Sequence, residues 1–209
     1  MNHFTPFLLP FGLLYGTVTA IRNLLFDIKI LPSKKFSVPV ISVGNLTTGG
    51  TGKTPHVEYL IRLLKDNYQI ATVSRGYKRK TSGFVIGDSN SDYRQLGDEP
   101  AQFIKKFPDI TVSVDESRVR GIKSIIALKP QTNVFLLDDA YQHRYVSAGL
   151  KILLTDYRNL YTRNYPLPAG NLREFRCGSN RADIIIVTKT DKVLPSMLRQ
   201  HLIEEIKPK

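Results

Sequence analysis

Short runs of apolar residues alternate along the chain with segments whose apolar positions recur every three or four residues. The short runs predict β-strands over residues 38–43, 69–74, 83–87, 110–114, 133–139, 150–156 and 183–191. The spaced pattern predicts helices over residues 55–66, 99–107, 116–128 and 195–206. Continuously apolar strands separated by helices are typical of an α/β fold, with a mostly parallel sheet and helices on both faces. The run 183–191 is expected to be a buried strand of this sheet.

The first part of the chain does not follow this alternation. From His3 to Ile21 it contains no Asp, Glu, Lys or Arg, and basic residues follow at Arg22, Lys29, Lys34 and Lys35. The stretch lacks the basic start of a signal peptide, and prolines and glycines weaken a spanning helix: Pro6, Pro10, Gly12 and Gly16. A helix packed on the protein's own core is a further alternative. We favour an interfacial helix whose basic flank meets anionic head groups. Residues 1–35 are therefore predicted to be a membrane-associating helical segment, and residues 36–209 a separate domain.

Composition narrows the classes of function. The chain has 209 residues, 42% of them hydrophobic, and a formal net charge of +12. This length and composition are sufficient for a globular core. The positive charge suggests an anionic membrane surface, a phosphorylated substrate or a nucleic acid as partner, with solubility alone as the other explanation. Cys177 is the only cysteine, which excludes an intrachain disulfide and a zinc site built on several cysteines.

The stretch TTGGTGKTP lies between a predicted strand and a predicted helix, which is the context of a phosphate-binding loop. The glycines allow the backbone to approach phosphates closely. The backbone of Gly49, Gly50, Thr51 and Gly52 is expected to cradle the phosphates. Lys53 is expected to reach the β- and γ-phosphates of a nucleotide, and the Thr54 hydroxyl to bind Mg²⁺. The usual spacing G-x-x-x-x-G-K-[ST] would place glycine at Thr47, so the chain departs from it there.

A second acidic element follows the apolar run VFLL. Asp138 and Asp139 are placed at the carboxyl end of a strand, where ligands bind in open parallel sheets. One of these carboxylates can hold Mg²⁺, directly or through water. The two elements together predict a P-loop NTPase-like domain that transfers phosphoryl groups, but they do not identify its substrate.

Five motifs in order resemble those of the tetraacyldisaccharide 4′-kinase family, the lipid A 4′-kinases of Gram-negative bacteria. They are SVGNLTTGGTGKTP, SRGY, GDEP, LLDDAYQHR and PAGNLRE. The resemblance covers about residues 5–190. It implies transfer of the γ-phosphate of ATP to the 4′-hydroxyl of a tetraacyl glucosamine disaccharide 1-phosphate in lipid A biosynthesis. It also implies a location at the cytoplasmic face of the inner membrane, through an N-terminal helix. We expect a monomer that needs ATP and Mg²⁺ and binds a glycolipid and the membrane surface, but no nucleic acid.

The resemblance also implies roles for individual residues. Asp98 of GDEP matches a carboxylate that acts on the attacking hydroxyl, although it could instead cap the following helix. Lys53 and Thr54 match the P-loop pair, and Asp138 and Asp139 the metal-binding acids. Arg173 matches an arginine that stabilises the transferred phosphate, with a surface ion pair to Glu174 as the alternative. Weaker substrate-binding candidates are Asn45, Arg75, Arg118, Gln142 and His143.

Two departures from the family pattern are visible. Ala140 and Tyr141 stand where the family has Gly-Phe before QHR. Family members are also longer and have a C-terminal lobe with an Asp-His-His stretch, one histidine of which pairs with the GDEP aspartate. We find no equivalent histidine here, and His201 is not assigned that role. The chain is expected to be either a fragment or a shortened form that lacks this lobe.

Two alternatives belong to other classes of protein. The tetrapeptide TKTD at 188–191 resembles the [NT]-K-x-D element that reads guanine, which would favour a nucleotide-switched targeting factor or metal chaperone. Thr188 replaces the usual asparagine, and the four histidines are scattered, so no metal-delivery cluster is apparent. The basic run 75–80 could bind nucleic acid, but such a run is more often a solvated loop or a lipid-facing patch.

Overall fold

The computed structural model describes residues 5–207, and these divide into two compact units. The first unit comprises residues 1–31, 45–52 and 152–209 as far as they are described, and the second comprises residues 32–44 and 53–151. The P-loop is therefore shared: residues 45–52 belong to the first unit, and Lys53 and Thr54 to the second. The expected division at residue 35 stays a prediction.

The second unit is built on five strands in the order β3-β4-β2-β5-β1. They are β1 (Val40–Asn45), β2 (Ile70–Ser74), β3 (Val85–Ile86), β4 (Thr111–Val114) and β5 (Val134–Asp138). Every neighbouring pair is parallel except β3 and β4, which are antiparallel. The α/β class and the mostly parallel sheet predicted from the sequence are confirmed.

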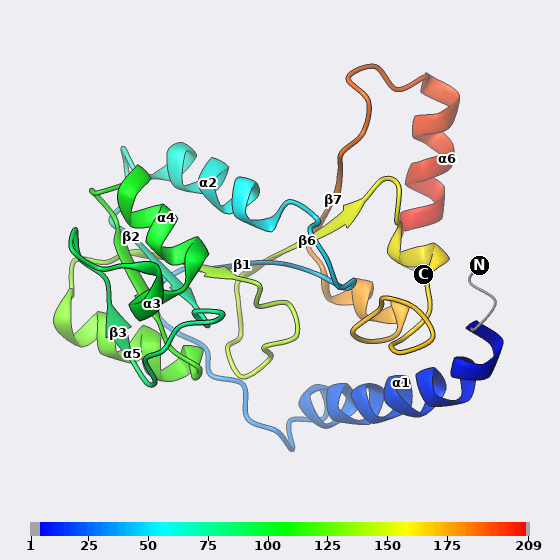
Figure 1. Cartoon of the computed structure of the whole chain (residues 1–209), viewed down its shortest axis with the longest axis horizontal. Helices are drawn as coiled ribbons and strands as arrows, with labels where there is room; N and C mark the ends of the chain where they lie inside the picture. The colour runs from blue at the N-terminus through cyan, green and yellow to red at the C-terminus, as the bar shows by residue number, and fades with distance from the viewer. Residues whose placement is uncertain (1–4, 208–209) are drawn as a thin grey trace. The chain divides into compact units, whose positions relative to one another are not determined.

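Helices cover both faces of these strands. They are α2 (Lys53–Leu64), α3 (Tyr93–Leu96), α4 (Asp98–Lys106) and α5 (Arg118–Leu128). In Figure 1, α2 and α4 lie on one face and α5 on the other. Strands β2 and β5 are buried along their whole length, as continuously apolar strands between two helical layers must be. On the α5 side the core includes Ala71, Val73, Ile122, Ile125, Phe135 and Leu137.

The first unit contains the N-terminal helix and the last two strands. Its elements are α1 (Thr5–Asp27), β6 (Leu150–Asp156), β7 (Ile184–Thr188), α6 (Ser196–Ile206) and the 3₁₀ turns η1 (Tyr161–Arg163) and η2 (Arg176–Arg181). Strands β6 and β7 are parallel. The prediction that 183–191 is a buried strand is wrong, because Ile184 is 44% exposed and only Thr188 of β7 is buried. Strand β7 is the last in the strand order, so it pairs along one side only.

Helix α1 is continuous through Pro10, although prolines and glycines were expected to weaken it. Gly12 and Gly16 are buried because α1 packs closely on the segment 166–175. A Cβ atom at Gly16 would lie 2.5 Å from the Phe175 ring, and one at Gly12 would lie 2.9 Å from Ala169 Cβ. The two glycines thus serve close packing.

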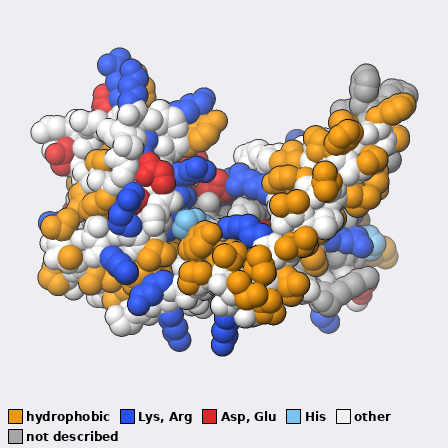
Figure 2. All heavy atoms as spheres, turned by 90° about the horizontal axis from the view of Figure 1, so that it is seen from below, with side chains coloured by type: hydrophobic (Ala, Val, Ile, Leu, Met, Phe, Trp, Pro, Cys, Tyr) orange, Lys and Arg blue, Asp and Glu red, His pale blue; other side chains and the backbone are white. Residues whose placement is uncertain are grey.

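The remaining surface of α1 is apolar and exposed. Exposed side chains include Phe7, Phe11, Leu14, Val18, Ile21 and Leu24, and Figure 2 shows hydrophobic side chains gathered over α1. The alternative of a helix packed on the protein's own core is therefore wrong for most of its surface. The stretch Pro6–Asp27 is long and apolar enough to cross a membrane, a test that signal sequences also pass.

Candidate functional site

The loop between β1 and α2 has the backbone that its glycines predict. Gly49 and Gly52 have positive φ angles of 104° and 84°, a conformation that side chains disfavour. The buried Asn45 amide donates a 2.9 Å hydrogen bond to Thr51 Oγ1 and so braces the loop. Thr47 forms an antiparallel bridge with Leu172. Residue 47 has no positive φ angle, so its backbone does not require the usual glycine.

Lys53 and Thr54 form the first turn of α2, and each contacts an acidic residue of the second unit. Lys53 Nζ lies 3.7 Å from Asp139 Oδ1. Thr54 Oγ1 donates a 2.9 Å hydrogen bond to Glu99 Oε1. The structure therefore brings three motifs to one place: the GKT sequence, the aspartate pair and GDEP. Sequence reasoning missed Glu99, although it directly follows Asp98 in the motif that was singled out.

Asp138 is the last residue of β5 and is 1% exposed. Burial, together with the nearby charges of Glu99 and Asp139, raises the pKa of its carboxyl to about 7, while Lys53 opposes this shift. Its Oδ1 accepts a 2.8 Å hydrogen bond from the Asp139 N–H, and its Oδ2 has no hydrogen-bond partner among the described residues. A buried carboxylate oxygen without a partner is unusual and is well suited to a cation.

The donors of this site fit Mg²⁺, which prefers oxygen ligands and usually keeps several waters and substrate phosphates in its shell. Thr54, Asp138 and Asp139 carry such oxygens, and Glu99 adds another nearby; their role as metal ligands stays a prediction. Within residues 5–207, no three His, Cys, Asp or Glu side chains are placed to chelate a metal alone. Water and nucleotide phosphates are the ligands that would complete such a shell.

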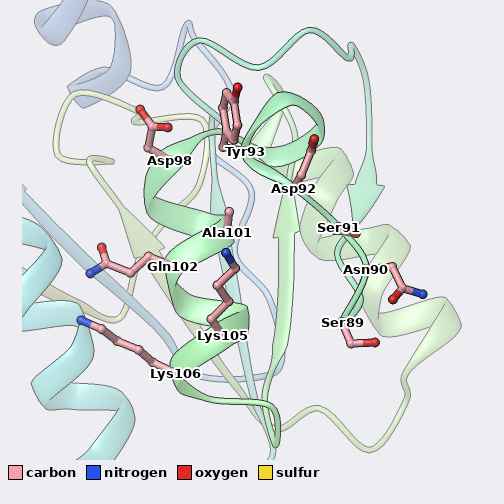
Figure 3. A pocket seen from close by; sticks show the side chains of 10 residues that line it. All are labelled: Ser89, Asn90, Ser91, Asp92, Tyr93, Asp98, Ala101, Gln102, Lys105 and Lys106. Atoms are coloured by element: carbon pink, nitrogen blue, oxygen red, sulfur yellow. The ribbon is translucent and has the colours of Figure 1, made fainter.

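Asp98 is the first residue of α4, and the N-cap is Gly97, with no side-chain capping bond. The alternative that Asp98 caps this helix is therefore wrong. Gly97 has a φ of 90°, and a Cβ atom there would lie 2.7 Å from Tyr77 O. Asp98 lines a surface pocket of about 570 Å³, together with Tyr93 and Gln102. Figure 3 shows it at the start of α4, with Lys105 farther along the helix.

Arg118, at the start of α5, gives the second unit a buried positive charge. It is 4% exposed, and its Nε has no hydrogen-bond partner among the described residues. Its guanidinium makes only 3.5 Å hydrogen bonds, to the carbonyls of Asp115 and Glu116. Burial and then the neighbouring Arg75 lower the pKa of Arg118 to about 10, while Asp139 and Asp138 raise it. An incompletely paired guanidinium near the aspartate pair is suited to an anion.

Arg173 belongs to the first unit, where its segment runs beside the P-loop. Its N–H donates a 2.7 Å hydrogen bond to Leu46 O, and Thr48 N–H donates one of 2.7 Å to Asn171 O. Glu174 is buried and accepts hydrogen bonds of 2.9 Å from Arg181 Nη2, so it does not lie on the surface, as the alternative of a surface ion pair with Arg173 assumes. The catalytic role of Arg173 stays a prediction.

The weaker substrate-binding candidates also stay predictions. Gln142 and His143 follow β5 in a turn in which His143 N–H donates to Ala140 O. Tyr141 packs so closely on β1 that a Cβ atom at Gly44 would lie 2.7 Å from its Cβ. A side chain at residue 141 therefore requires glycine at residue 44 of the neighbouring strand.

Comparison with known proteins identifies the family. Residues 4–206 match the family model described as tetraacyldisaccharide-1-P 4′-kinase. The chain belongs to this family. It is 57% identical over 194 residues to the tetraacyldisaccharide 4′-kinase of Flavobacterium johnsoniae, covering 93% of this chain and 57% of that protein. It is 55% identical over 205 residues to that of Flavobacterium psychrophilum, covering 98% and 60%.

A solved structure supports the same assignment. The crystal structure of LpxK from Aquifex aeolicus in complex with ATP has a TM-score of 0.82 and 38% sequence identity, and the match covers 92% of this chain and 62% of that one. The chain thus spans about 60% of the length of these relatives. Membership of this kinase family does not favour the switch or metal-chaperone alternative.

Proposed function

We propose that the chain carries the nucleotide site and phosphoryl-transfer residues of a tetraacyldisaccharide 4′-kinase. ATP is the donor, and the acceptor is the 4′-hydroxyl of a tetraacyl glucosamine disaccharide 1-phosphate in lipid A biosynthesis. One observation carries the proposal: Lys53 and Thr54 contact Asp139 and Glu99, which brings the P-loop pair, the aspartate pair and GDEP together. Membership of the family and the ATP complex of the Aquifex aeolicus relative support it.

In this mechanism the protein holds the phosphates and activates the hydroxyl. The loop amides of residues 49–52 and the Lys53 ammonium bind the β- and γ-phosphates, and the Lys53–Asp139 ion pair opens as the nucleotide enters. Thr54, Asp138 and Asp139 would hold Mg²⁺, which would neutralise charge on the phosphate oxygens. To act as a metal ligand, the Thr54 hydroxyl would have to give up its hydrogen bond to Glu99.

Asp98 orients the acceptor hydroxyl and takes its proton. The hydroxyl oxygen forms a bond to the γ-phosphorus, and the bond from that phosphorus to the bridging oxygen of ADP breaks. The products are ADP, the phosphorylated glycolipid and the proton held by Asp98. The Arg118 and Arg75 guanidinium groups and Arg173 are proposed to stabilise the transferred charge, because guanidinium groups match phosphate geometry.

The apolar surface of α1 is proposed to bind the inner membrane from its cytoplasmic face, where ATP is present and the acyl chains of the acceptor remain in the bilayer. Arg22 and the lysines that follow α1 would add attraction to anionic head groups. We further propose that the protein acts as a monomer.

The experiment is a transfer assay with the 209-residue chain, labelled nucleotide and the tetraacyl disaccharide 1-phosphate in mixed micelles. The expected result is label in the lipid with Mg-ATP and much less with Mg-GTP. An acceptor methylated at the 4′-hydroxyl should receive none. A preference for GTP without any need for acceptor would contradict the proposal and favour a switch.

A further inference from the structure

The TKTD element at residues 188–191 lies against the P-loop, within the first unit. Thr188 Oγ1 donates a 3.0 Å hydrogen bond to Thr51 O. Lys189 Nζ donates one of 2.5 Å to Gly50 O. Two consecutive carbonyls of the loop are therefore held by two consecutive residues at the carboxyl end of β7.

Both donors are themselves held in place. The Thr188 hydroxyl is buried and also lies 3.3 Å from Thr155 O of β6. The Lys189 ammonium lies 2.6 Å from Asp156 Oδ2, the last residue of β6. Lys189 adopts a φ of 57°, a left-handed conformation that is uncommon for lysine. Such a conformation persists where the surrounding contacts compensate for it, as these contacts do.

The direction of the carbonyls determines the direction of the amides. In a planar trans peptide the C=O and the following N–H point to opposite sides. Holding Gly50 O and Thr51 O toward β7 therefore turns the N–H groups of Thr51 and Gly52 toward the other side of the loop. That is the side on which a P-loop binds phosphate. The Thr51 N–H already donates to Gly49 O at 3.2 Å and so tightens this turn, which leaves the Gly52 N–H as the amide that the two carbonyl contacts direct to the phosphate side.

We infer that Thr188, Lys189 and Asp156 form a carbonyl clamp that holds the P-loop in its phosphate-binding conformation, with Lys189 as a positioning residue. This inference rests on the proposed nucleotide site but not on the identity of the acceptor. The role inferred for TKTD therefore differs from the guanine recognition that its sequence resembles. Here the lysine contacts the phosphate-binding loop and not a base.

The first test measures hydrogen exchange at the amides of residues 49–52 in the nucleotide-free chain. Lys189→Met removes the ammonium and keeps the aliphatic stem, and Thr188→Val removes the hydroxyl and keeps the shape. Both should speed exchange at these amides several-fold, whereas Lys189→Arg and Thr188→Ser should restore most of the protection. Lys192→Met, at an exposed neighbouring lysine, is the matched control for lost charge. Unchanged exchange in Lys189→Met would overturn the clamp.

The second test compares three probes by titration calorimetry: Mg-ATP, Mg-tripolyphosphate and adenosine. The clamp predicts that Lys189→Met weakens Mg-ATP and Mg-tripolyphosphate by a similar factor, on the order of tenfold, and leaves adenosine binding unchanged. Weaker binding of Mg-ATP with unchanged tripolyphosphate binding would overturn the clamp and favour a base-reading role. If the unaltered chain binds no nucleotide while loop exchange still responds to Lys189→Met, the proposed function fails and the clamp stands.

Discussion

Thr54 Oγ1 donates a 2.9 Å hydrogen bond to Glu99 Oε1, and Glu99 is also the neighbour that most strongly raises the pKa of Asp138 after burial itself. The GDEP motif therefore does more than present Asp98. Its glutamate accepts a hydrogen bond from the hydroxyl that we propose as a Mg²⁺ ligand, and it favours the protonated form of Asp138, the aspartate that we propose as another. If Thr54 and Asp138 bind Mg²⁺ as proposed, Glu99 links the first turn of α2 to the protonation of Asp138.

This coupling can be measured with Glu99→Gln. The amide oxygen can still accept the Thr54 hydroxyl hydrogen bond, but the negative charge is removed, so the pKa of Asp138 should fall. Carbon-13 NMR of the aspartate carboxyl groups follows that titration directly. Glu204→Gln, at an exposed position of α6, should leave it unchanged. An unaltered Asp138 titration in Glu99→Gln would show that the two carboxylates do not interact.

The raised pKa of Asp138 predicts a definite dependence of stability on pH. The folded chain holds this proton up to about pH 7, whereas a free aspartate releases it near 3.8. Between these values the folded state binds more protons than the unfolded state, so this residue lowers stability as pH rises. The free energy of unfolding falls by at most about 1.4 kcal/mol per pH unit from this residue.

Urea unfolding of the metal-free chain and of Asp138→Asn at several pH values isolates this contribution. The difference in unfolding free energy between the two chains should change steadily between pH 4 and pH 7. The unaltered chain should lose stability relative to the variant. A difference that is independent of pH would contradict the assignment. Saturating Mg²⁺ with nucleotide should reduce the slope, because metal binding requires the deprotonated carboxylate.

Gly97 is predicted to be indispensable to the position of Asp98. Gly97→Ala places a Cβ atom 2.7 Å from Tyr77 O at a φ of 90°, and backbone atoms cannot move aside cheaply. The expected cost is about 1–3 kcal/mol of unfolding free energy, measured by denaturant titration. Gly149→Ala is the matched control, because the nearest atom to its Cβ is 3.8 Å away. Equal stabilities for the two variants would contradict this prediction.

Gly16 is predicted to be needed for packing of α1 on the segment 166–175. A side chain there would overlap the Phe175 ring, so Gly16→Val should separate helix and segment locally. Hydrogen exchange in residues 166–175 should then rise. Thr17→Val changes an exposed position of the same helix and should have little effect. Equal hydrogen exchange of residues 166–175 in the two variants would contradict this prediction.

The sequence was sufficient to predict the α/β class, the P-loop and the aspartate pair, because each follows from a local pattern. The exposure of β7 was missed, since an apolar run does not reveal whether a strand has neighbours on one side or two. The contacts of Glu99 and Lys189 were missed for another reason. Their contacts with Thr54 and Gly50 join residues that are far apart in the sequence, and only the fold brings them together.

The most direct test of the central claim is a single-turnover measurement with Asp98→Asn. The variant keeps the P-loop residues, so it should bind Mg-ATP within about twofold of the unaltered chain. It should transfer the γ-phosphate to the tetraacyl disaccharide 1-phosphate at least about 100-fold more slowly, because the group that takes the hydroxyl proton is absent. Asp66→Asn, at an exposed aspartate, is the control. Transfer by Asp98→Asn at the unaltered rate would contradict the account.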